Sequence, residues 1–276
     1  MKSYDLIAFD MDGTLLDSGK RIRQDSLEMI HEASLENKIV VLSTGRSVPE
    51  LLSYRKELKD VRYCICASGA EITEGIGGKV LYSQSIQREI ALKLFERIRD
   101  FDAMIHFHSD SSIIQKDYFC RMQDYQMGNY TSLFKDVTLQ VDDIIEYYRK
   151  TNVPLYKINL YSKSPEERER LKALIQDMEL TEVYSEITSL ECSARGVSKG
   201  SGLVNLCRIK DIPLDKTIAV GDSFNDLEIL KAAGLSVAMG NAREEVKSIS
   251  DVTVKSNDEG GCAEAIREYL LEKRIA

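Results

Sequence analysis

LIAFDMDGT, residues 6–14, is a short apolar run followed at once by two aspartates. An apolar run of this length is typical of a buried parallel strand, and open α/β sheets bind their ligands at the carboxyl ends of such strands. Alternation along the strand would put Asp10 and Asp12 on one side, and Gly13 permits a sharp turn. Two carboxylates in one small space require a cation between them or a retained proton. We therefore expect chemistry here rather than a loop of solvated acids.

The sequence on either side of this stretch alternates between strand and helix patterns. Further apolar runs, each followed by a helical pattern or a turn, predict strands over residues 39–42, 63–67, 216–220 and 235–239. This alternation is typical of a parallel, doubly wound sheet. Between them, amphipathic helices and alternating strands predict an inserted α+β domain. The predicted fold class is α/β, with a Rossmann-like core of residues 1–82 and 188–276 and an insert of residues 83–187.

Composition limits the class of protein and its partners. The chain has 276 residues, of which 43% are hydrophobic and 30% charged, as in ordinary soluble globular proteins. A net charge of −8 argues against a nucleic-acid partner. No stretch approaches the roughly 18 apolar residues of a membrane span, and no secretory signal is present. Six scattered cysteines indicate free thiols. We expect a cytoplasmic protein without a membrane partner, and the sequence leaves its oligomeric state open.

Polar groups follow other predicted strands as well. Thr44 and Gly45 come after the second strand, Lys199 lies near a predicted helix start, and Asp222, Asn225 and Asp226 follow the strand over residues 216–220. Because parallel strands end at one edge of a sheet, we expect these groups to converge with Asp10. A cluster of carboxylates with few ligands suits Mg²⁺, which keeps waters and binds substrate phosphate.

Phosphate chemistry explains the pair of aspartates. Hydrolysis of phosphate monoesters is very slow without a catalyst and requires accelerations of up to about 10²¹-fold, so electrostatic stabilisation must be joined by a nucleophile. A carboxylate can form an acyl phosphate, which water then cleaves. A second carboxylate two residues away is placed to protonate the leaving oxygen and later to deprotonate that water.

Four segments together resemble the four motifs of the haloacid dehalogenase superfamily of phosphohydrolases. In chain order they are Asp10–Thr14, Ser43–Arg46, Val197–Gly200 and Gly221–Asp226. The insert is similar to the large cap domain of the class IIB, Cof-type branch, and the resemblance covers nearly the whole chain. One departure is Ser68, which stands where this branch usually has asparagine before Gly-Ala.

The resemblance implies a role for each matching residue. Asp10 is the nucleophile and a metal ligand, and Asp12 is the general acid and base, with its backbone carbonyl facing the metal. Asp222 completes the Mg²⁺ site, while Asp226 orients Lys199 or a metal-bound water. The phosphate is held by the remaining group, which comprises Thr44, the amides of Gly45 and Met11, Lys199 and Asn225.

These residues predict a Mg²⁺-dependent phosphatase that hydrolyses small phosphorylated metabolites through an aspartyl-phosphate, with the insert closing over the site. Two alternatives are a phosphosugar mutase similar to the phosphomannomutases and a non-enzymatic phospho-acceptor module of the receiver kind. Arg46 either reaches the substrate or pairs with a core acid. His106 and His108 alternate onto one face of a predicted strand, but two histidines without a third ligand are more often surface or substrate-proximal groups. We assign no metal to them.

Overall fold

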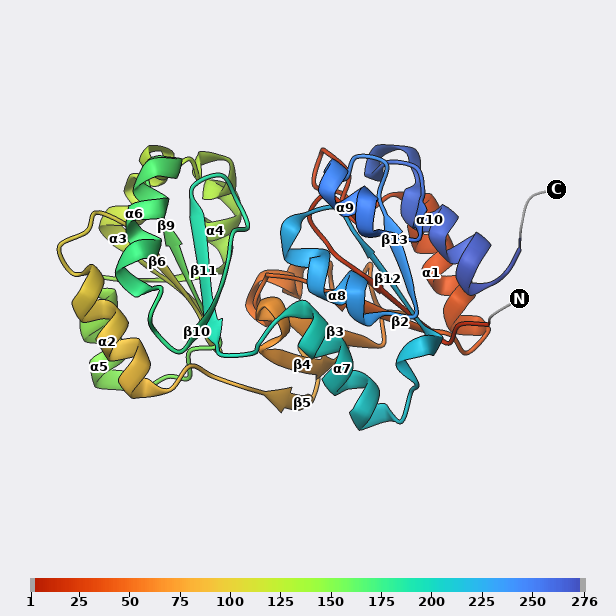
Figure 1. The fold of residues 1–276 in the computed structure, drawn as a ribbon, viewed down its shortest axis with the longest axis horizontal. Coiled ribbons are helices and arrows are strands. Elements are labelled where there is room, and N and C mark those ends of the chain that lie inside the picture. The colour runs from red at the N-terminus through yellow and green to blue at the C-terminus, as the bar shows by residue number, and fades with distance from the viewer. Residues whose placement is uncertain (1–2, 274–276) are drawn as a thin grey trace. The chain divides into compact units, whose positions relative to one another are not determined.

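The computed structural model describes residues 3–273, which form two compact units (Figure 1). The core unit comprises the chain up to Gly45, Leu51–Tyr82 and the chain from Ser198 onward. The cap unit comprises Arg46–Glu50 and Ser83–Val197. Across residues 3–273, no helix has the length and apolar character needed to cross a membrane.

The core unit is built on an eight-stranded sheet in the order β14-β13-β12-β1-β2-β3-β4-β5. From β14 to β3 all neighbours are parallel, and β4 pairs with β3 in the antiparallel sense. The strands are β1 (Leu6–Phe9), β2 (Ile39–Ser43), β3 (Tyr63–Cys66), β4 (Glu71–Glu74), β5 (Val80–Ser83), β12 (Thr217–Gly221), β13 (Leu235–Ala238) and β14 (Val252–Thr253). β1 is buried throughout and lies between β12 and β2.

Helices lie on both sides of this sheet, as the strand–helix alternation predicts. In Figure 1, α1 and α10 lie together on one side, and α7 and α8 on the other. The α-helices are α1 (Gln24–Leu35), α7 (Lys199–Lys210), α8 (Leu227–Ala232), α9 (Glu244–Ile249) and α10 (Gly261–Ala265), which continues as a π-helical turn over Ile266–Leu270. Short 3-10 helices are η1 (Val48–Tyr54), η2 (Ala67–Gly69), η5 (Leu214–Lys216), η6 (Phe224–Asp226) and η7 (Asn257–Glu259). The predicted doubly wound α/β class is confirmed.

The cap unit contains a six-stranded sheet in the order β10-β11-β9-β6-β7-β8. Its neighbours are antiparallel except β7 and β8, which are parallel. The strands are β6 (Met104–His108), β7 (Ser112–Gln115), β8 (Thr138–Val141), β9 (Lys157–Tyr161), β10 (Leu180–Val183) and β11 (Ser189–Ala194). The helices are α2 (Arg88–Ile98), α3 (Lys116–Cys120), α4 (Thr131–Val137), α5 (Ile144–Thr151) and α6 (Pro165–Ile175), with 3-10 turns η3 (Met122–Tyr125) and η4 (Gly128–Tyr130).

The two faces of the cap sheet differ in chemistry because side chains alternate along each strand. On one face, Phe107 of β6 packs against Phe95 of α2 and Tyr148 of α5, with ring centroids 5.3 and 6.0 Å apart. The opposite face of β6 carries Met104, His106 and His108, and it is partly covered by an apolar cluster that includes Phe134 of α4. A buried polar strip therefore runs along β6 on the face away from α2.

The predicted domain boundaries need two corrections. Residues 188–197 were expected in the core, but β11 bonds to β9 and β10 in the middle of the cap sheet, so the core resumes only at Ser198. Arg46–Glu50 was also expected in the core, but it belongs to the cap unit, where Glu50 contacts His106 and His108. Both differences arise from contacts between segments far apart in the sequence.

Candidate active site

Asp10 follows the last residue of β1 and is held by backbone bonds on both sides. Its N–H donates to the Val220 carbonyl at 3.0 Å, and its own carbonyl accepts from the Leu15 N–H at 3.3 Å. Gly13 has φ +86°, and a Cβ there would lie 2.6 Å from Asp222 Oδ2. Glycine is therefore required at this turn by both backbone conformation and space.

Lys199 is the first residue of α7, where the sequence placed a helix start. Ser198 caps the helix, since its Oγ accepts from the Ser201 N–H at 3.1 Å and the Ser201 hydroxyl lies 2.9 Å from the Ser198 N–H. The Lys199 ammonium donates to Asp10 Oδ1 at 2.5 Å and to Asp226 Oδ1 at 2.7 Å. Its side chain is only 1% exposed, so this is a buried pairing of one cation with two carboxylates.

Asp222 and Asp226 follow β12 and face Asp10. The other oxygen of Asp226 accepts from the N–H groups of Asp222 and Ser223 at 3.0 and 3.1 Å. Thr14 Oγ1 donates to Asp222 Oδ1 at 2.7 Å. One oxygen each of Asp10, Asp222 and Asp226 lie within 4.8 Å of one another. The structure thus brings together carboxylates that are more than 200 residues apart in the chain.

The electrostatics of this cluster favour binding of a cation. Burial raises the pKa of Asp10 well above its usual range, and the charges of Asp226 and Asp222 add to this effect, while Lys199 opposes it. Burial and the charge of Asp226 also raise the pKa of Asp222 to about 6. Burial alone would lower the pKa of Lys199, but Asp10 and Asp226 outweigh burial and raise it, so the ammonium stays charged. Three ionised carboxylates would outnumber the one ammonium, so a bound cation would favour the ionised forms of Asp10 and Asp222.

The donor set fits a hard divalent cation, because carboxylate oxygens are the ligands that such ions prefer. Both oxygens of Asp226 are engaged, one by Lys199 and one by two backbone N–H groups. Among the described contacts, Asp10 and Asp222 each have one hydrogen-bonded oxygen. Their second oxygens could therefore bind an ion, whereas Asp226 holds Lys199.

Asp12 is not one of the three carboxylates of this cluster, although its charge helps to raise the pKa of Asp222. β1 ends at Phe9, so strand alternation does not extend to Asp12. Its Oδ1 accepts from the Lys20 ammonium at 2.7 Å, and its side chain is 32% exposed. Its role as acid and base stays a prediction. Neither the contact of Lys20 nor the bond between Thr14 and Asp222 could be found from sequence patterns, because each depends on how the turn after β1 folds.

Thr44 and Met11, two of the predicted phosphate-binding residues, are both buried. The Thr44 N–H donates to the Ile65 carbonyl at 2.8 Å, and the Thr44 carbonyl accepts from the Ser68 N–H at 3.0 Å. Gly45 follows Thr44 directly and is partly exposed. The backbone polar groups of Thr44 are thus used within the core.

Asn225 lies in the 3-10 turn η6, directly before Asp226. Its Oδ1 is buried and has no hydrogen-bond partner within residues 3–273. Buried polar atoms are nearly always hydrogen-bonded, so an orphaned one beside a carboxylate cluster indicates a group that a ligand or ion completes.

Ser68, the departure from the expected motif, lies in a segment with left-handed backbone conformation. Ala67, Ser68 and Gly69 have φ of 47°, 58° and 106°. A Cβ on Gly69 would lie 2.0 Å from the Ser198 carbonyl oxygen. This tight segment therefore supports Thr44 through the Ser68 N–H and lies directly against the start of α7, which carries Lys199.

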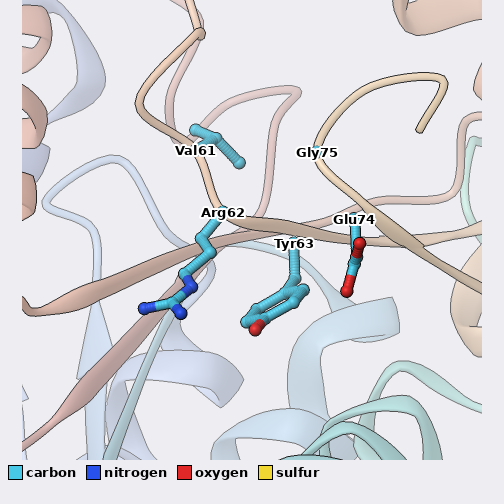
Figure 2. Close-up of a pocket in the computed structure, with 5 residues that line it drawn as sticks. All are labelled: Val61, Arg62, Tyr63, Glu74 and Gly75. Carbon is cyan, nitrogen blue, oxygen red and sulfur yellow. The ribbon is translucent and has the colours of Figure 1, made fainter. Parts of the chain in front are cut away.

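A separate surface pocket is lined by Val61, Arg62, Tyr63, Glu74 and Gly75 (Figure 2). Tyr63 begins β3, and its register partner Glu74 ends the antiparallel strand β4. The pocket therefore lies at the ends of the strands opposite to the ends where Asp10 follows β1. None of the predicted site residues lines it.

Comparisons with known proteins cover almost the whole chain. The sequence profile of the family described as haloacid dehalogenase-like hydrolase matches residues 7–266. Phosphatase YwpJ of Bacillus subtilis (strain 168) is 29% identical, over 96% of this chain and 99% of that protein. The 5-amino-6-(5-phospho-D-ribitylamino)uracil phosphatase YcsE of the same organism is 28% identical, over 96% of each chain. A solved haloacid dehalogenase-like hydrolase from B. subtilis superposes with a TM-score of 0.86 at 28% identity, over 95% of this chain and 99% of that one.

Proposed function

Because this chain belongs to the haloacid dehalogenase-like hydrolase family and is a phosphatase, we propose that it hydrolyses small phosphorylated metabolites with Mg²⁺ through a phosphorylated Asp10. The observation that carries the proposal is the buried contact of the Lys199 ammonium with Asp10 and Asp226, next to Asp222. It supports a nucleophilic role for Asp10, because a fixed positive charge and a group of carboxylates that could hold a metal ion lie beside it.

In the proposed first step, an oxygen of Asp10 attacks the phosphorus and the bond to the leaving oxygen breaks. Asp12 gives its proton to that oxygen, so the leaving group departs as an alcohol. In the second step Asp12 takes a proton from a water molecule, whose oxygen attacks the phosphorus of phospho-Asp10 and releases inorganic phosphate. Throughout both steps Lys199 offsets the charge on the phosphate oxygens, while Thr44 and Asn225 donate hydrogen bonds to them.

Asp10, Asp222 and the backbone carbonyl of Asp12 would hold the Mg²⁺ ion. When bound, the ion supplies positive charge that draws phosphate and nucleophile together. The oxygen-only donor set and the three carboxylates beside a single ammonium support this assignment.

The substrate class is proposed from the chemistry and from a relative. YcsE is described as a phosphatase of a phosphorylated ribitylaminouracil, a small metabolite. We place sugar phosphates and related phosphomonoesters first among candidates for this chain. The buried free thiols, such as Cys64 and Cys66, support a reducing compartment, which favours the cytoplasm.

Release of p-nitrophenol from p-nitrophenyl phosphate tests the proposal. Activity should require Mg²⁺, disappear with a chelator and be abolished by Asp10→Asn. Asp5→Asn is a matched control, because exposed Asp5 precedes β1 as Asp10 follows it. Retention of most activity in Asp10→Asn would refute the assignment of Asp10 as the nucleophile. A panel of sugar phosphates, nucleotides and phosphorylated cofactors then identifies the substrate class.

A further inference from the structure

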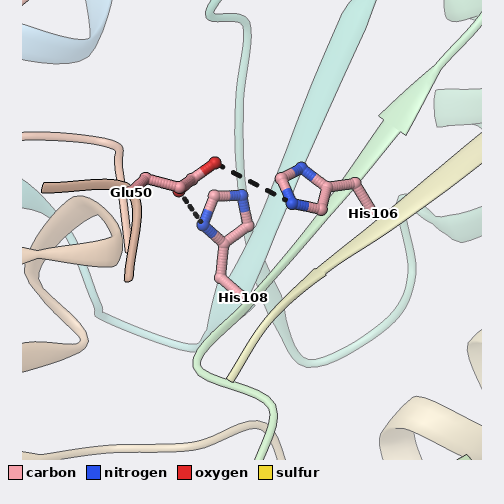
Figure 3. Close-up of side chains that lie close together, drawn as sticks. All are labelled: Glu50, His106 and His108. Atoms are coloured by element: carbon pink, nitrogen blue, oxygen red, sulfur yellow. Dashed lines mark ion pairs between the residues drawn. The ribbon is translucent and has the colours of Figure 1, made fainter. Parts of the chain in front are cut away.

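Glu50, His106 and His108 converge in the cap unit (Figure 3). Glu50 Oε2 lies 3.3 Å from His108 Nδ1, and Glu50 Oε1 lies 3.9 Å from His106 Nε2. The two imidazole rings have centroids 4.3 Å apart. Figure 3 shows the carboxylate turned towards both rings, so a single small ion between the three side chains would contact all of them.

The third member of this cluster is the one that the sequence did not reveal. His106 and His108 share a face of β6 by alternation, as the sequence predicted. Glu50 comes from the segment 46–50, more than 50 residues earlier. Its carboxylate is fixed because Oε2 accepts from both the N–H and the hydroxyl of Ser47 at 2.7 Å. The donor set is therefore two imidazoles and one positioned carboxylate.

Burial puts these groups in the protonation states that ligate metals. The exposed fractions of the Glu50, His106 and His108 side chains are 4%, 1% and 3%. Burial lowers the pKa of both histidines, so they are neutral, the form that binds metals. Burial alone would raise the pKa of Glu50, but the positive charge that His108 and His106 carry when protonated, together with the Ser47 N–H, outweighs burial and lowers it.

The other charges that face this cluster come from the neighbouring strands of the same sheet. Lys157 of β9 is opposite His108 in register, and it pairs with Glu191 of β11 at 2.9 Å. The charge of Lys157 still lowers the pKa of both histidines and opposes a cation, whereas the charge of Glu50 raises it and favours one. For both histidines the effect of Glu50 is the larger of the two, so the balance of charge at the cluster favours a cation.

An unsatisfied ring nitrogen of His108 is a further sign that a ligand is missing. His108 Nδ1, which lies 3.3 Å from Glu50 Oε2, is buried without a hydrogen-bond partner among the described residues. The Asn159 side-chain amide nitrogen lies 3.1 Å from His108 Nε2 and holds the ring with Nδ1 facing Glu50. Metal-binding histidines donate a hydrogen bond from their second nitrogen, so metal binding at Nδ1 requires the proton on Nε2. Asn159 Oδ1, which is buried without a partner in the described chain, is the acceptor that a rotated amide would offer to this N–H.

We propose that Glu50, His106 and His108 form a second metal site, which binds a transition-metal dication of the Zn²⁺ class in preference to Mg²⁺. Imidazole ligands select Zn²⁺ and its neighbours, whereas Mg²⁺ prefers oxygen. Ligand atoms about 2.0 Å from a tetrahedral ion lie about 3.3 Å apart, close to the contacts of Glu50 with both histidines. His106 Nε2 contacts the Ser112 hydroxyl at 2.6 Å, and metal binding would replace this contact.

Such a site goes beyond the phosphatase reaction, because none of its three ligands belongs to the proposed catalytic cluster. It ties the segment 46–50, which follows Thr44 and Gly45 in the chain, to β6 of the cap sheet. Metal binding is therefore expected to stabilise the fold of the cap unit, since the site forms only when these segments are together.

Calorimetric titration of the metal-free, full-length protein with Zn²⁺ tests this site. Saturating Mg²⁺ is present throughout, so that the aspartate cluster is occupied. We expect one Zn²⁺ ion to bind per chain. His108→Ala and His106→Ala should each weaken Zn²⁺ binding roughly 100-fold or more, at least as much as the loss of a residue that only hydrogen-bonds to a metal ligand. His31→Ala is the matched control, because His31 is the remaining histidine of the chain and pairs with Asp60 at the surface. The Zn²⁺ affinity of His31→Ala should equal that of the wild-type protein.

A second measurement does not depend on variants that fold. X-ray absorption at the zinc edge of the loaded wild-type protein should show two imidazole ligands and one carboxylate, and zinc should raise its unfolding temperature more than Mg²⁺ does. The proposed site would be overturned if the wild-type protein took up no zinc or if the zinc were bound by oxygen atoms alone. It would also be overturned if the Zn²⁺ affinity were unchanged in both His106→Ala and His108→Ala.

Discussion

Lys199 Nζ donates to Asp10 Oδ1 at 2.5 Å in a fully buried contact between residues 189 positions apart. The same ammonium also contacts Asp226, which is anchored by two backbone N–H groups. The positive charge is therefore in place beside the proposed nucleophile before any substrate arrives. Preorganised charge of this kind stabilises a transition state without the cost of rearranging solvent.

Loss of the Lys199 charge should affect both catalysis and stability. Lys199→Met leaves Asp10 and Asp226 buried without their cation, so we expect kcat to fall about 10²- to 10³-fold. The free energy of unfolding should fall by about 3–5 kcal/mol in metal-free buffer, the cost of breaking a buried pair. Steady-state kinetics and urea unfolding measure these two effects. Lys210→Met, in the same helix, is the control, and a wild-type kcat in Lys199→Met would contradict the role of this charge.

Removal of the Asp12 carboxyl should separate the two proposed steps. Asp12→Ala retains Asp10 and Lys199 but lacks the group that activates water, so the phosphorylated enzyme should accumulate with an activated substrate such as p-nitrophenyl phosphate. Acid quenching followed by mass spectrometry of the peptide that contains Asp10 detects it. The double variant with Asp10→Asn should show no such phosphate, and hydrolysis at the wild-type rate in Asp12→Ala would exclude the acid–base role.

Gly13 should control the position of Asp222. In Gly13→Ala the new Cβ would lie 2.6 Å from Asp222 Oδ2 and the residue keeps φ near +86°, so Asp222 must move. We expect the Mg²⁺ affinity to fall roughly tenfold, as when a metal ligand loses its support. Gly196→Ala separates this effect from backbone strain, because Gly196 has φ +81° but no atom within 4 Å of an added Cβ. Equal Mg²⁺ affinities in the two variants would disprove the steric explanation.

Asn225 should matter for the substrate more than for the fold. Its buried Oδ1 has no partner in the described chain, so Asn225→Ala should change the free energy of unfolding by less than about 0.5 kcal/mol. The same variant should lower kcat/KM by at least about tenfold, because one hydrogen bond to the phosphate is lost. Asn225→Asp should be worse, since its charge repels phosphate. A large loss of stability with an unchanged kcat/KM would reverse this assignment.

The buried ion pair of Lys157 and Glu191 should hold the polar face of the cap sheet together. Lys157→Met leaves Glu191 as an unpaired buried charge, and we expect a loss of about 3–5 kcal/mol in the free energy of unfolding. Replacing both residues, Lys157→Met with Glu191→Leu, should recover most of that loss. Urea unfolding of the two single variants and the double variant forms a double-mutant cycle. Additive losses would show that the two residues do not depend on each other.

Prediction from the sequence was most successful where a feature depends on neighbouring residues. The apolar run before Asp10 and the Ser198 cap before Lys199 are local patterns, and the structure contains β1 and the start of α7 at those positions. The boundary near residue 188 was wrong because an isolated strand such as β11 does not indicate which sheet it joins. The contact of Asp12 with Lys20 was not predicted, because it depends on the conformation of the turn.

The alternation of strands and helices, the polar residues at strand ends and the family could all be read from the amino-acid sequence, because side-chain periodicity and motif order are properties of consecutive residues. The contact of Lys199 with Asp10 and the cluster of Glu50 with His106 and His108 became visible in the three-dimensional structure alone. These pairs are separated by tens to hundreds of residues, and their distances are set by how whole elements pack. That packing minimises exposed apolar surface across the entire chain, which no local pattern records.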